Sequence, residues 1–171
     1  IVASILVLFV VATYFLSLRL ISQLHFHKAK NHLHDGYYGL AINKLEKALH
    51  YQNDDFTTWN YLGRAYHKLG ELKPSEQAVR NAWKSRQAYL KAAQLNPLDA
   101  EAAFGLAREE ARLEQLYAYL HRDEDDNPYH AFPYYEEAIR LRPNGISYHY
   151  ALARYLHKQG KTEALLPIVT N

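Results

Sequence analysis

The sequence predicts an all-α fold in which an N-terminal transmembrane helix is followed by an α-solenoid of about four helical hairpins, two with insertions. Three observations lead to this fold class. The chain begins with a long apolar segment that carries no charge. Beyond it, apolar and small residues recur at helical spacing, with little of the alternation typical of strands. One short pattern also recurs along the chain, at periods that indicate a repeat array, and it centres on Ala29, Gly63, Ala107 and Ala153, which are 34, 44 and 46 residues apart.

The apolar segment runs from Ile1 to Leu18 and ends at Arg19. At about 1.5 Å per residue it covers roughly 27 Å, close to the hydrocarbon thickness of a bilayer. A cleaved signal peptide fits less well, because no charged region precedes the run and Ser17-Leu18-Arg19 is a poor cleavage site. A buried core helix is disfavoured by the lack of a polar face. We therefore expect a single-pass anchor over residues 1–20 and a repeat domain over residues 21–171.

Composition narrows the function classes. The 171 residues carry a formal net charge of +2, which does not favour nucleic acid as a partner. The absence of cysteine excludes disulfides, cysteine-ligated zinc and cysteine nucleophiles. The sequence has no methionine, even at position 1, so we expect it to be part of a longer reading frame.

The repeat domain divides into units of about 22–55, 56–99, 100–145 and 146–171. Helix-breaking residues stand where helices should end, for example Gly70, Asn96-Pro97 and Pro143. The helical pattern is clearest in six segments: 40–49, 61–69, 78–95, 100–120, 134–141 and 148–156.

The strongest copy of the pattern is carried by Trp59, Leu62, Gly63 and Tyr66, followed by Ala92 and Pro97. In these positions the chain resembles the tetratricopeptide repeat (TPR) family, over about residues 21–168. The resemblance implies antiparallel helix pairs stacked into a right-handed superhelix, with the first helix of each pair lining a concave surface. It also implies that the small and aromatic residues of the pattern serve packing.

The units depart from the family pattern in particular places. The first has His25 and His32 where large aromatic residues normally stand. The second carries ten extra residues within 73–95, which we expect to form one long helix opened by Pro74. The third carries twelve, including an acidic tract over residues 121–128 that we expect to be a loop, and Pro167 interrupts the last helix of the fourth.

No metal site, cofactor site or catalytic residue is predicted. On a helix, His25 and His32 lie two turns apart, as do His27 and His34, which is too far to share one ion. The acidic tract begins like a calcium loop, but Pro128 stands where that loop needs glycine. No nucleophile elbow or glycine-rich phosphate loop is present. We therefore expect a protein that is not an enzyme.

The first helices share a further pattern. In each unit the residue after the small packing position is basic, and residues one turn before and after it lie on the same helix face. By the resemblance, this face lines the concave groove. Such a groove suits a segment with carboxylates and apolar anchors, although plain solvation of the face by Lys and Arg is the alternative. The predicted groove residues are Phe26, Lys30, Asn60, Arg64, Lys68, Phe104, Arg108, Arg112, Tyr150, Arg154 and Lys158.

These features together predict a membrane-anchored scaffold or assembly subunit that holds protein partners, including another membrane protein. One alternative is the soluble tail of a larger polytopic membrane enzyme of the O-antigen-ligase type, and another is a purely structural subunit of a large complex or filament. The resemblance to anchored bacterial envelope arrays suggests a periplasmic repeat domain. The basic residues Arg19, Lys28 and Lys30 after the span favour the cytoplasmic side instead, so the sidedness stays open.

Overall fold

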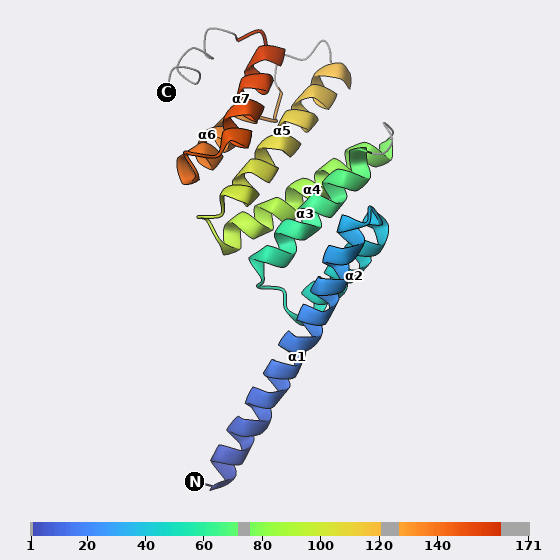
Figure 1. Cartoon of the computed structure of the whole chain (residues 1–171), viewed down its shortest axis with the longest axis vertical. Helices are drawn as coiled ribbons and strands as arrows, with labels where there is room; N and C mark the ends of the chain where they lie inside the picture. The colour runs from blue at the N-terminus through green and yellow to red at the C-terminus, as the bar shows by residue number, and fades with distance from the viewer. Residues whose placement is uncertain (1, 72–75, 121–126, 162–171) are drawn as a thin grey trace.

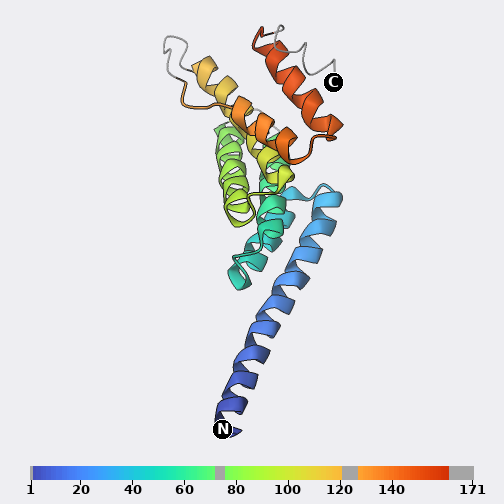
Figure 2. The ribbon, with the colours of Figure 1, turned by 90° about the vertical axis from the view of Figure 1, so that its left-hand side faces the viewer.

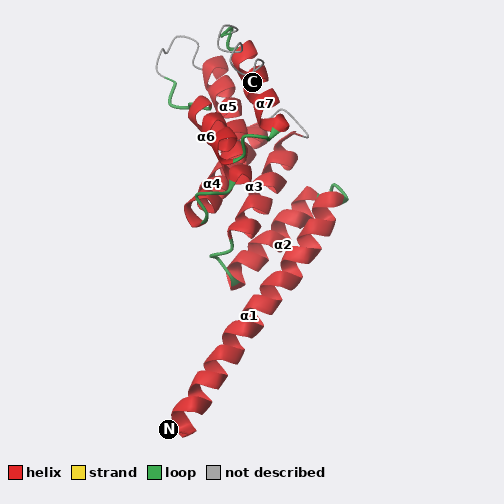
Figure 3. Cartoon of the chain, turned by 60° about the vertical axis from the view of Figure 1, so that its left-hand side comes forward, coloured by secondary structure: helices red, strands yellow, loops and turns green. Residues whose placement is uncertain are grey.

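The structure, a computed structural model, describes residues 2–71, 76–120 and 127–161. Every regular element within these ranges is a helix, which confirms the predicted all-α class (Figure 3). The helices are α1 (Val2–His34), α2 (Tyr38–Tyr51), α3 (Phe56–Glu71), α4 (Glu76–Leu95), α5 (Ala100–Leu120), α6 (Phe132–Leu141) and α7 (Ile146–Lys158).

The predicted span forms the first half of α1, which projects from the body of the molecule as a straight rod (Figure 1). Its most apolar 18-residue window has a mean hydropathy of 2.2, and none of that window is buried. The helix is therefore long and apolar enough to cross a membrane. It continues without a break past residue 20, so the second half of α1 is also the first helix of the first hairpin.

The remaining helices stack in chain order. The pairs α1–α2, α3–α4 and α5–α6 are antiparallel hairpins, and each helix also contacts the next along the chain. Contacts of α3 with α1 and with α5 place the first helices of successive hairpins side by side, as Figure 2 shows from the edge of the stack. The result is the α-solenoid that the sequence predicts.

The six helical segments expected from the sequence all lie within described helices, whereas some other expectations fall on residues outside the described ranges. The third unit's first helix covers the predicted residues 100–120, and α4 is described from Glu76, so the predicted opening at Pro74 is not described. Most of the acidic tract and Pro167 also fall outside the described ranges. Asp55 and Asp99 start α3 and α5, because their carboxylates accept hydrogen bonds from the backbone N–H groups of Thr57 (3.1 Å) and Glu101 (3.0 Å).

The core confirms the packing role of the small residues. Ala29 and Ala107 are at most 1% exposed, and Ala153, near the end of the stack, is half-buried. One apolar cluster joins α1, α2 and α3 with Ala88 of α4, and a second joins α5, α6 and α7. Between them lies Tyr89 of α4, whose ring fills the space left by Gly63 of α3 and Gly105 of α5. These close approaches set the spacing of the helices that line the site described below.

Candidate functional site

A groove runs across the first helices of the second, third and fourth units. One hollow of about 570 Å³ lies between α3 and the start of α5, and a second of about 440 Å³ lies between α5 and α7. The two hollows share His67, Phe104 and Arg108, so they form one continuous surface. Aromatic rings from several helices contribute to its lining: Tyr61, Tyr89, Phe104, Tyr135, Tyr150 and Tyr155.

The structure brings together most of the residues that the sequence pattern assigns to a groove. All the predicted residues from the second, third and fourth units line it: Asn60, Arg64, Lys68, Phe104, Arg108, Arg112, Tyr150, Arg154 and Lys158. Helical spacing on three parallel helices is enough to place them there, because each triplet occupies one face of its helix.

The first unit departs from this arrangement. Phe26 is only 8% exposed and packs in the core, with its ring edge-on to Tyr61 at 5.1 Å. Lys30 lies over the same two rings, with its Nζ 5.9 Å from the ring centroid of Phe26 and 5.7 Å from that of Tyr61. Neither residue is among those that line the two hollows, so the structure does not bring them together with the other predicted groove residues. The reason is that Tyr61 of α3 covers this face of α1.

Several lining residues are already engaged within the protein, among them three that the sequence pattern predicts. The Asn60 side-chain amide donates to Asp99, and Lys68 Nζ donates to Glu71 at 2.7 Å. The Arg112 guanidinium donates to the backbone carbonyl of Gly70, in the last turn of α3, at 2.7 Å. Asn60 and Arg112 therefore link the second unit to the third as well as lining the groove, whereas Lys68 is paired within α3.

The basic residues that follow the small packing positions behave differently. Within the described part of the chain, Arg64, Arg154 and the nearby Lys158 make no ion pair with a carboxylate, and all three are exposed. Arg108 is half-buried, with its guanidinium 5.1 Å from the ring centroid of Phe104. The groove thus offers cationic groups above an aromatic surface, which can bind carboxylates through charge-assisted hydrogen bonds.

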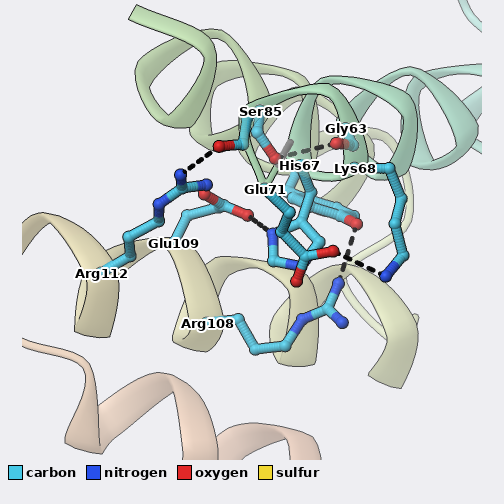
Figure 4. Close-up of polar contacts among 10 residues, drawn as sticks. Gly63, His67, Lys68, Glu71, Ser85, Arg108, Glu109 and Arg112 are labelled. Carbon is cyan, nitrogen blue, oxygen red and sulfur yellow. Dashed lines mark hydrogen bonds and ion pairs between the residues drawn. The ribbon is translucent and has the colours of Figure 1, made fainter. Parts of the chain in front are cut away.

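Beneath these cations lies a buried polar network that the sequence analysis missed (Figure 4). Glu109 of α5 has no exposed surface, and its carboxylate meets Nδ1 of His67 in α3. Nε2 of the same ring lies 3.2 Å from Glu71. The next residue, Glu110, is also buried and accepts a hydrogen bond from Arg86 of α4 at 2.6 Å. The sequence signal for this network was the position of the two glutamates on the helix. Glu109 and Glu110 come two and three residues after the packing residue Ala107, and they point towards α3 and α4.

Burial and charge change the acidity of groove residues. Burial alone would raise the pKa of Glu71, but the hydrogen bond from Lys68 and the neighbouring cationic groups lower it below its usual range. Burial raises the pKa of Tyr89 to about 12, and it also raises that of Tyr135 to about 12. Glu71 therefore stays ionised and neutralises Lys68, whereas both tyrosines present neutral hydroxyls.

No group of three or more His, Asp and Glu side chains that could hold a metal ion occurs in the described ranges. Two of the first-unit histidines contact aromatic rings, with His25 stacked on Tyr51 and His32 edge-on to Tyr37. The acidic residues Asp123 and Asp125 of the calcium-like tract lie outside the described residues.

Solved structures with the same fold are helical repeats. The chain superposes on the first TPR of Spaghetti (RPAP3), bound to the HSP90 peptide SRMEEVD, with a TM-score of 0.66 and 15% identity, covering 83% of this chain and 95% of that one. It superposes on a crystal structure of MamA with a TM-score of 0.64 and 17% identity, covering 86% and 73%. No protein-family model matches the chain, and no curated protein matches it. At these identities the likeness concerns the fold, and the chain has a TPR-like helical-repeat fold.

Proposed function

We propose that this protein is a membrane-anchored scaffold or assembly subunit that holds an acidic, aromatic-bearing segment of a partner protein in the groove across α3, α5 and α7. The observation that carries the proposal is the register of Arg64, Arg108 and Arg154, which come from three successive units and line one continuous surface. The aromatic lining supports apolar anchors on the same segment. Binding of a peptide by one structural neighbour agrees with this use of the fold.

The anchor is supported by the exposed apolar surface of α1. Side chains such as Leu8 and Phe9 are more than 60% exposed and have no protein partner to cover them within the described structure. Soluble proteins seldom expose apolar patches of this extent. A hydrocarbon environment removes that surface from water, and a partner that also spans the membrane would be within reach of the groove.

The groove is tested with two fluorescent peptides on the full chain in lipid nanodiscs. One peptide carries four glutamates and two phenylalanines, and the other has glutamine in place of each glutamate. We expect the acidic peptide to bind at least about tenfold more tightly, because each charged hydrogen bond contributes roughly 1.5–3 kcal/mol. Equal affinities would contradict the proposal.

Charge reversal then locates the site. Arg64→Glu with Arg154→Glu should reduce affinity for the acidic peptide by about tenfold or more and leave the helical circular dichroism unchanged, because both side chains are exposed. Arg108 is left intact, since its guanidinium packs on Phe104. The matched control is Arg80→Glu with Lys91→Glu on exposed positions of α4, outside the groove. An equal loss in both pairs would show a general charge effect and no site.

A further inference from the structure

The outer face of the first hairpin carries an ordered series of side chains. Leu16, Leu20 and Leu24 follow one another at single-turn spacing along α1, and they are 66%, 64% and 54% exposed. The next position in the series is Lys28, one turn further from the apolar end of the helix. The apolar stripe on this face thus extends about 9 Å beyond Leu18 before the first lysine.

The second helix places further side chains close to Lys28, around His25 of α1. Lys44, Lys47 and Tyr51 share one side of α2, at the edge of the buried face of that helix. Tyr51 stacks on His25 of α1, with ring centroids 5.9 Å apart and an interplanar angle of 3°. Because α2 runs antiparallel to α1, Tyr51 lies nearest the apolar end and the two lysines lie further along.

The three lysines converge around His25. Burial lowers the pKa of His25, and the positive charges of Lys44, Lys47 and Lys28 lower it further. The charges that act on this ring are all positive, and none of the three lysines forms an ion pair in the described part of the structure. Asp55, in the turn to α3, is engaged by Thr57 and Thr58. The face therefore has a positive charge that the protein does not neutralise.

We propose that this juxtamembrane face, made of Leu20, Leu24, Lys28, Lys44, Lys47 and Tyr51, binds the headgroups of anionic phospholipids. The inference rests on the membrane anchor proposed above. Its basis is the order of the groups along the axis of α1: apolar residues first, then a tyrosine, then lysines. A bilayer leaflet presents hydrocarbon, interface and phosphate in the same order, and tyrosine is favoured at the interface. A docking face for a protein would have no need of this order.

The test measures lipid selectivity around the full chain. It is reconstituted in phosphatidylcholine bilayers, and electron paramagnetic resonance compares spin-labelled phosphatidylglycerol with spin-labelled phosphatidylcholine at its surface. Each lysine near an anionic surface contributes about fivefold. We therefore expect a preference of at least fivefold for phosphatidylglycerol, weaker at high salt, that falls to near one in Lys28→Gln/Lys44→Gln/Lys47→Gln. The matched control, Arg80→Gln/Lys91→Gln/Lys161→Gln, changes exposed residues outside both the groove and this face and should keep the wild-type preference.

The outcomes separate this inference from the proposed function. Wild-type protein that resists alkaline extraction from the bilayer but shows no lipid preference would overturn the lipid site alone. A preference that survives the triple substitution, or that disappears equally in the control, would also overturn it. Release of the wild-type chain by alkaline extraction would overturn the anchor and the lipid site together. The peptide affinity of the groove is measured separately and is expected to be the same in all three proteins, because none of the substituted residues lines the groove.

Discussion

The contact between Gly105 and Tyr89 offers the sharpest test of how the groove is built. A methyl group added at residue 105 would lie 2.5 Å from Cδ1 and Cζ of the Tyr89 ring, about 1 Å closer than an ordinary contact. The ring cannot retreat, because a Cβ on the opposite side at Gly63 would already be 2.9 Å from it. Gly105→Ala therefore forces either the ring or helix α5 to move.

The expected magnitude follows from two opposing effects. Alanine stabilises a helix interior by roughly 0.5–1 kcal/mol relative to glycine. Overpacking in a close-packed core costs about 1–3 kcal/mol, and an overlap held on both sides belongs at the upper end. The net destabilisation should be about 2 kcal/mol. For a chain of this size that corresponds to a fall of about 4–8 °C in the melting temperature.

The assay is thermal unfolding of the full chain in detergent, followed by circular dichroism. The matched control is Gly39→Ala in α2, where an added methyl group has nothing within 4 Å and should stabilise slightly. Tyr89→Leu combined with Gly105→Ala should recover part of the loss, because leucine can adjust its rotamer. If Gly105→Ala is as stable as the Gly39→Ala protein, the close packing of the Tyr89 ring between Gly63 and Gly105 is wrong.

Two further outcomes are expected. Glu109→Ala should lower the free energy of unfolding, measured by urea titration, by about 3–5 kcal/mol, because it leaves His67 buried without its carboxylate partner. The double variant Glu109→Leu/His67→Leu removes both partners, and its stability should lie much nearer that of the wild type. Equal losses in the two variants would argue against a buried pair. In alkali, the raised pKa values of Tyr89 and Tyr135 contribute stability that is complete below pH 10 and is lost as the pH rises towards 12. Tyrosinate absorbance and helicity should therefore change together between pH 10 and 12, and ionisation of all tyrosines near pH 10 would refute this.

The sequence was sufficient to predict the fold because its signals are local. The spacing of Gly63, Ala107 and Ala153 and the breakers between them define hairpins whose neighbours must stack. The same periodicity predicted which faces of α3, α5 and α7 line the groove. It could not predict which polar side chains of the groove are free, since that depends on partners in other units: Asn60 meets Asp99, and Arg112 meets the carbonyl of Gly70.

The buried charges were missed for a related reason. In a linear reading, Glu109 and Glu110 look like a solvated pair, and only the packing of α5 against two neighbouring helices reveals that both are enclosed. Phe26 shows the opposite case. Its position in the repeat matches that of the groove aromatics, but the Tyr61 ring of the next unit covers it.

The unbroken course of α1 gives the apolar segment control over the direction of the groove. One continuous helix forms both the apolar segment and the first helix of the repeat stack. Any rotation of the apolar segment about its axis therefore rotates the whole stack, including Arg64, Arg108 and Arg154. One residue inserted after Arg19 would turn the whole stack by about 100° about the helix axis and raise it by about 1.5 Å. Seven inserted residues, close to two full turns, would raise it by about 10 Å and almost restore its heading. Whatever surrounds the apolar segment and fixes its rotation therefore also fixes the direction, about the axis of α1, from which a partner must approach the groove.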